Sequence, residues 1–306
     1  MALEQERKLT VQLTKALRPT KLRLDRIVRE LATTEESTAL FYHKLNSAIR
    51  KNYRQAKKVF KDWSEEEIIR YYNQEISKQL NKFKKSAALK GTYINITKFK
   101  NKHKTKSTVN DLVDQTQADY NAGLIGGEKD LLQLSSLTQR KNGARGITDF
   151  QNKQRKELIK NSIDGKYIAI IDKNGKKRRY NLKSYSETVT RTSLRESSTL
   201  SVVNTTVGVG ADLVQVSSHN TNTKFDAQFE GKIYSLSGKD PDFPKATFLP
   251  PFHPRCIHSI STIFRETLER RGIQKYIDFS DGKTDKPPNQ ETFKPVSERK
   301  FQAWVH

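Results

Sequence analysis

The feature that most constrains this chain is its excess of positive charge. Its 306 residues contain 57 Lys and Arg but only 34 Asp and Glu, which gives a formal net charge of +23. Self-repulsion of this size opposes a compact fold unless a polyanion lies nearby. We expect DNA, RNA or an anionic membrane face as that polyanion, and we favour nucleic acid because no stretch pairs a basic face with a strongly apolar one.

Composition narrows the setting in which the chain works. The hydrophobic fraction is 34%, below the roughly 45–50% of ordinary globular domains, so we expect a thin or uneven core within about two domains. No run approaches the roughly 20 apolar residues that span a bilayer, and the charged first residues lack the apolar core of a signal peptide. The single cysteine, Cys256, cannot form an intramolecular disulfide, which fits a reducing compartment. These features predict a cytoplasmic protein, or one packaged there into a particle, without a membrane partner.

The first half of the chain is predicted to form long helices. Apolar residues recur at three- and four-residue steps in residues 13–31, 45–60 and 69–83. We expect Pro19 to interrupt the first stripe, and Ser64 with Glu67 to form a capping box that begins a new helix. Residues 111–150 read as helix and loops, with breaks at Gly123, at Gly126-Gly127 and at Asn142-Gly143.

A lysine-rich arm carries much of the charge excess. From residue 41 to residue 110 there are 18 Lys or Arg and 5 Asp or Glu, and residues 84–110 show little periodicity. Lysines alternating with small polar residues predict non-specific, salt-sensitive contacts with phosphates, and no base-reading motif is present. The expected DNA contacts are Lys84, Lys85, Lys98, Lys100, Lys102, Lys104 and Lys106.

The second half predicts a compact α+β unit. A hairpin of residues 167–171 and 178–182 turns at Asn174-Gly175, whose residues accept the positive φ angles of a tight turn. A helix over 186–206 and strands at 213–216, 232–236 and 257–261 follow. The overall expectation is therefore an α+β chain: a basic helical region (1–148), a compact α+β domain (149–265) and an extended or disordered C-terminal tail (266–306).

One group of residues invites a chemical interpretation: His219, Asp226, His253, Cys256 and His258. The favoured interpretation is a structural turn, with His253 held extended before Pro254 and Cys256 as a small buried group. A zinc site is the first alternative, although H-x-x-C-x-H is not a standard finger spacing. The second is a nucleophile–base pair of Cys256 with His219 or His258, for which no third orienting residue is evident. The chain contains no Walker loop, no HExxH and no G-x-S-x-G.

Three pieces of the second half resemble a known family. They are the helix at 185–192, the segment from Ser218-His219 through Asp226 to 231–235, and the ending Pro251-Phe252-His253-Pro254-Arg255-Cys256-Ile257-His258. On these residues the region 150–265 is similar to the minor head proteins of tailed bacteriophages, the Mu F-like or phage minor capsid protein 2 group. The chain departs from the pattern at Ser193, where the family often has Glu.

The resemblance implies a non-catalytic phage minor head protein, taken up during procapsid assembly and involved in head morphogenesis and in genome retention or delivery. Its expected partners are the portal protein, double-stranded DNA and a capsid or scaffolding protein, and its expected place is inside the virion head after assembly in the host cytoplasm. No cofactor is expected, with zinc as the alternative. Two other functions stay open: a metal-dependent nuclease or toxin that uses the His/Cys/Asp group, and a host nucleic-acid-binding protein.

Overall fold

The structure is a computed structural model that describes residues 2–36, 38–85, 105–143, 146–172, 174–221, 223–285 and 287–288. The chain divides into two compact units. Unit 1 comprises Met1–Ile68 and Asp111–Ser193, and unit 2 comprises Ile69–Asn110 and Leu194–His306. This division does not fall at the expected boundary between residues 148 and 149. It falls inside three helices, and each of these helices contributes residues to both units.

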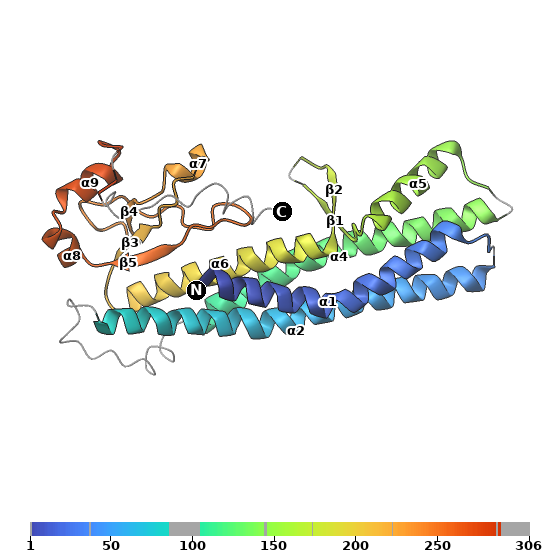
Figure 1. Ribbon diagram of the computed structural model, residues 1–306, viewed down its shortest axis with the longest axis horizontal. Helices are drawn as coiled ribbons and strands as arrows, with labels where there is room; N and C mark the ends of the chain where they lie inside the picture. Colours follow the sequence, from blue (N-terminus) through green and yellow to red (C-terminus); the bar gives the residue numbers. More distant parts are fainter. Residues whose placement is uncertain are drawn as a thin grey trace. The chain divides into compact units, whose positions relative to one another are not determined.

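Unit 1 is built mainly from long helices (Figure 1). Its elements are α1 (Ala2–Thr33), the first part of α2 (Ala39–Lys85), most of α4 (Thr105–Asn142), α5 (Asp149–Ile163), β1 (Ile168–Ile171), β2 (Lys177–Tyr180) and the start of α6 (Leu182–Gly208). Phe60 of α2 stacks on Tyr120 of α4 with ring centroids 3.7 Å apart. Thr138 of α4 donates to the carbonyl of Leu31 in α1 at 3.5 Å. The apolar stripes thus pack helix on helix, as the sequence predicts.

Two expected helix boundaries are wrong. α1 runs through Pro19, and α2 runs through Ser64 without interruption. Proline removes one backbone hydrogen bond, and the packing of Leu13, Leu17 and Leu24 on the buried side of α1 holds the helix together across it. Ser64 does not cap a helix, because its Oγ donates to the Lys61 carbonyl at 2.9 Å and accepts from Gln117 Nε2 at 2.9 Å. The hydroxyl links α2 to α4.

The expected breaks at Gly123 and Gly126-Gly127 are also wrong, since α4 continues through all three. These glycines allow a close approach between α4 and β1. A Cβ on Gly126 would lie 2.0 Å from the Ala169 carbonyl oxygen, and one on Gly127 would lie 1.8 Å from that of Tyr167. Only residues without a side chain fit there, whatever their low helix propensity.

The hairpin is confirmed. β1 and β2 pair antiparallel from Ile168 opposite Tyr180 to Ile171 opposite Lys177. Gly175 has a φ of 73° and donates to the Asp172 carbonyl at 2.9 Å, as the Asn-Gly pair predicts.

Unit 2 centres on a three-stranded antiparallel sheet with the order β4-β3-β5. Its strands are β3 (Leu213–Val216), β4 (Ile233–Ser235) and β5 (Ile260–Ile263). The first two agree with the sequence, and β5 begins three residues later than expected. Together with the long helices, this sheet and the hairpin confirm the α+β class.

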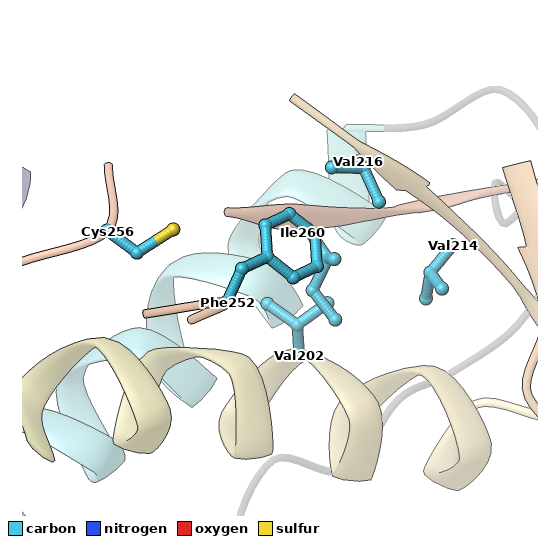
Figure 2. Packing of buried hydrophobic residues seen from close by; sticks show 6 residues of the cluster. All are labelled: Val202, Val214, Val216, Phe252, Cys256 and Ile260. Carbon is cyan, nitrogen blue, oxygen red and sulfur yellow. The ribbon is translucent and has the colours of Figure 1, made fainter. Parts of the chain in front are cut away.

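The two faces of the sheet carry separate cores. Val214 and Val216 face a cluster completed by Val202 of α6, Phe252, Cys256 and Ile260 (Figure 2). Leu213 faces the opposite cluster, whose other members are Ile233, Phe243, Leu268 and Tyr276. The alternation along β3 is the two-residue period of a strand with both faces covered.

The expectation of an extended tail from residue 266 is wrong for its first part. Residues Arg265–Arg270 form α8 and Gln274–Ser280 form α9. Leu268 and Tyr276 are buried against the sheet, and Ser280 Oγ accepts from the backbone N–H of Ile233 at 3.1 Å. These short helices are stabilised by burial against the sheet. The rest of the predicted tail, residues 289–306, lies outside the described residues.

Among the described residues, no helix has an apolar stretch long enough to cross a bilayer.

Candidate functional site

The outer side of α2 in unit 1 carries a row of cations. Leu45, Ile49, Ala56 and Phe60 are buried on the inner side of the helix. The exposed cations, called the basic face below, are Lys44, Arg50, Lys51, Arg54, Lys58 and Lys61. Steps of three, four and seven residues keep them on one side of the helix. At 1.5 Å per residue the face extends for about 25 Å.

The basic face contains no compensating acid of its own. No Asp or Glu occurs between Glu36 and Asp62. Lys61 lies 3.8 Å from Glu65, and both side chains are exposed. Among the described residues no ion pair engages the other five cations, whereas half-buried Lys57 pairs with Glu128 at 3.7 Å. The face therefore presents its charge to solvent.

Most of the seven sequence-predicted DNA contacts lie outside the described residues. Lys84 is exposed in the last turn of α2, and Lys85 is the last residue of that helix. Lys106 lies in the first turn of α4, and the side chains of Lys85 and Lys106 are not among those described. Lys98, Lys100, Lys102 and Lys104 lie outside the described residues. Sequence reasoning missed the basic face as a unit, although its helical spacing within an acid-free stretch was a usable signal.

The second candidate is a polar group in unit 2, called the His258 cluster below: Cys256, His258 and Glu230. Cys256 Sγ lies 3.4 Å from His258 Nδ1, and His258 Nε2 donates to Glu230 Oε1 at 2.8 Å. Glu230 also accepts the backbone N–H groups of Asn220 at 2.9 Å and Thr221 at 3.3 Å. His258 is fully buried, and Cys256 belongs to the core in Figure 2.

In the His258 cluster, hydrogen bonds shift the pKa of each group in the direction opposite to the shift caused by burial. Burial raises the pKa of the Cys256 thiol, but hydrogen bonds with His258 and with backbone groups bring it below the ordinary value. Burial lowers the pKa of His258, and its bonds to Cys256 and Glu230 raise it overall. Burial raises the pKa of Glu230, and its bond from His258 and those from backbone amides lower it overall. The cluster therefore favours a charged His258–Glu230 pair.

Glu230 was not among the sequence candidates. It supplies the third residue that the Cys256–His258 pair lacked, since it orients the imidazole from the opposite ring nitrogen. The signal in the sequence is weak: Glu230 is the only acidic residue between Asp226 and Asp240.

Of the other sequence candidates, the structure pairs His253 with Asp226 and places His219 beside His258. His253 Nε2 donates to Asp226 Oδ2 at 2.9 Å, and its Nδ1 lies 2.9 Å from the Pro254 carbonyl oxygen. The bond to Pro254 is the main cause that raises the pKa of His253, with Asp226 adding to it. His219 lies 2.9 Å from Ser217 Oγ, and its ring centroid is 5.1 Å from that of His258. Burial, followed by the neighbouring His258, lowers the pKa of His219.

These contacts hold loops together. Asp226–His253 joins the short helix α7 (Lys224–Ala227) to the segment before Cys256, while Glu230–His258 joins the turn before β4 to the segment before β5. Within the described part of the chain, no group of three or more His, Cys, Asp or Glu side chains is arranged to hold a metal ion. The geometry adds an orienting carboxylate, Glu230, to the Cys256–His258 pair.

Comparison of the chain with family models, with curated proteins and with solved structures finds no match.

Proposed function

We propose that this chain is a non-catalytic minor head protein of a tailed phage that binds double-stranded DNA through the basic face of α2 and contacts the portal protein. The basic face is the observation that carries the proposal. Six exposed cations lie along about 25 Å of helix, and a DNA duplex carries about one phosphate charge per 1.7 Å of its axis. Such a face fits phosphate contacts that fix no base sequence.

Two further features support the assignment to a phage head. Residues 150–265 resemble the Mu F-like minor head proteins, and the net charge of +23 suits a chain enclosed with packaged DNA. The His258 cluster is tied into the core of unit 2, which supports a structural role for the family-like ending. Inside the head, the chain would neutralise part of the DNA charge and remain near the portal during genome retention or delivery.

A salt titration tests the DNA contact. Lys51→Gln, Arg54→Gln and Lys58→Gln are combined in the full-length chain, and binding to a 30-base-pair duplex is followed by fluorescence anisotropy. Removing three phosphate contacts lowers the slope of log K against log salt by about 3 and weakens binding at low salt by at least about tenfold. The matched control combines Lys153→Gln, Lys156→Gln and Lys160→Gln, which remove three exposed cations from α5 of the same unit. An equal loss in both variants would show a response to total charge and would remove the basic face from the proposal.

A second variant separates the basic face from the sequence-predicted arm. Lys98, Lys100, Lys102 and Lys104 are replaced together by Gln and measured in the same titration. A comparable fall in slope would show that both segments contact DNA, whereas an unchanged slope would remove the arm.

The head assignment is tested by co-expressing the chain with the portal protein of the same phage and sedimenting the portal rings. Co-sedimentation supports the proposal, while absence from both portal rings and assembled particles contradicts it. The nuclease or toxin alternative predicts a stoichiometric metal in the purified protein and DNA cleavage that His253→Ala abolishes.

A further inference from the structure

Unit 2 exposes two phenylalanine rings that lie close together. Phe225 of α7 is 48% exposed, and Phe248, in the segment between β4 and β5, is 45% exposed. Their ring centroids are 6.2 Å apart. Scattered apolar side chains are normal on a protein surface, but neighbouring exposed aromatic rings are typical of an interaction site.

The exposed rings rest on two inner ones. Phe229 and Phe252 stack with centroids 4.6 Å apart, and Phe248 stacks on Phe252 at 5.6 Å. Phe252 in turn belongs to the buried core beneath the sheet (Figure 2). We call these four residues the phenylalanine patch. Aromatic anchors backed by a packed core are the usual energetic centre of a protein interface.

The patch is formed before any partner arrives. The Asp226–His253 hydrogen bond joins α7, which carries Phe225, to the segment that carries Phe252. Backbone N–H groups of Asp226 and Phe229 donate to Thr223 and Asp226 within the α7 turn, both at 3.0 Å. A partner would therefore meet rings that are already positioned, which lowers the entropy lost on binding.

The charges near the patch in the sequence are positive. Lys224, Lys245 and Arg255 are exposed, and residues 243–264 contain no Asp or Glu. The nearest carboxylates in the sequence, Asp226 and Glu230, are buried and bonded to His253 and His258. Complementary charge on a partner would therefore come from carboxylates.

The same features argue against other occupants. A second copy would bring another net charge of +23 against the first. Residues 289–306 of this chain contain three Lys or Arg and only two Glu, so they lack the acidic excess. The two outer rings are inclined at 72°, which is unlike the flat platform on which nucleic-acid bases stack.

We infer that the phenylalanine patch, with Lys224 and Lys245 close to it in the sequence, is the docking surface for an acidic protein surface with an apolar recess. Under the proposed function, on which this identification rests, that partner is the portal protein. The DNA-binding and portal-binding surfaces are then carried by different residues, with DNA on unit 1 and the portal on unit 2.

The test measures binding of the full-length chain to purified portal rings by biolayer interferometry. Phe225→Ala with Phe248→Ala is expected to weaken binding at least about tenfold, the size of effect that truncating interface anchors produces. Lys224→Glu with Lys245→Glu is expected to weaken binding and to reduce its salt dependence, without touching the core. The matched control is Val207→Ala, which truncates another exposed apolar residue of unit 2. Both double variants are expected to bind duplex DNA as the wild type does.

The outcomes separate the two proposals. If the wild-type chain does not bind portal rings, the head assignment fails and the docking partner falls with it. If it binds and both double variants bind equally well, the docking surface alone is overturned. Single-stranded DNA and anionic vesicles are tested in parallel. If the phenylalanine variant no longer binds one of these two ligands but still binds portal rings, the patch is the binding site for that ligand and the inference is overturned.

Discussion

The basic face of α2 and the His258 cluster place charge in opposite ways. The basic face spreads six cations over an exposed helix side, where each is solvated and none depends on another. The His258 cluster places one imidazole and one carboxylate in the interior, where each is the other's principal partner. Exposed charges act additively and are screened by salt, whereas a buried pair fails when one member is removed. The comparison therefore predicts gradual losses in unit 1 and abrupt ones in unit 2.

The largest effect is expected from Glu230→Ala. It leaves the buried His258 without its carboxylate and is expected to lower the free energy of unfolding by about 3 kcal/mol. Urea unfolding followed by circular dichroism measures the change. Glu65→Ala, which removes the partner of exposed Lys61, is the control and is expected to leave stability within error. An equal loss of unfolding free energy in the two variants would contradict the expected difference between buried and exposed charges.

A packing change in unit 1 is expected to cost somewhat less. Gly127→Ala places a Cβ against the Tyr167 carbonyl and is expected to destabilise the protein by about 2 kcal/mol, although alanine favours helices. Gly143→Ala, at the C-terminal end of α4, is the control, with its closest contact at 3.1 Å. Increased stability of the Gly127 variant would show that α4 and β1 are not in close contact.

A smaller effect concerns pH. The pKa of His258 is raised, so its contribution to stability is complete below the ordinary value of 6.5 and is lost as pH rises through the raised value. The pKa of Glu230 is lowered, so its contribution is complete above the ordinary value of 4.5 and is lost as pH falls through the lowered value. Stability from this pair is therefore greatest between about pH 4.5 and 6.5. Unfolding measured above and below pH 6.5 should show a weaker dependence in His258→Gln, and an unchanged dependence would assign it to other groups.

The smallest effect is expected from a single change on the basic face. Lys58→Gln is expected to reduce the salt slope of DNA binding by about 1 and to leave the urea midpoint unchanged. A change of stability without a change of the salt slope would show that Lys58 has a structural role. The basic face would then differ less from the His258 cluster than we expect.

The sequence predicted the features that depend on local pattern. Long helices followed from apolar stripes such as Leu45, Ile49 and Phe60, and the hairpin followed from Asn174-Gly175. Features that depend on distant contacts were mispredicted. Gly126 and Gly127 looked like breaks because nothing in the sequence shows that the backbone of β1 lies against them. Ser64 looked like a cap because its partner Gln117 lies 53 residues away.

The candidate site shows the same limit. The sequence candidates were His219, Asp226, His253, Cys256 and His258. The structure pairs Asp226 with His253, and Cys256 with His258. Glu230 was missed because a single acid in a turn has no periodic signal, and only the folded strands bring it to His258. The basic face was missed as a unit because its cations alternate with buried residues along the sequence and gather on one side only when the helix forms.

The contact between α4 and β1 also bears on how distant relatives of this chain could be found. An exposed lysine can be exchanged for arginine or moved by one turn, so the basic face would leave only a diffuse trace in diverging sequences. Gly126 and Gly127 have no such freedom, because any side chain would collide with the carbonyls of Ala169 and Tyr167. A glycine pair within a long helix, followed by a short β-rich segment, is therefore the pattern by which remote homologues of this unit would be recognised.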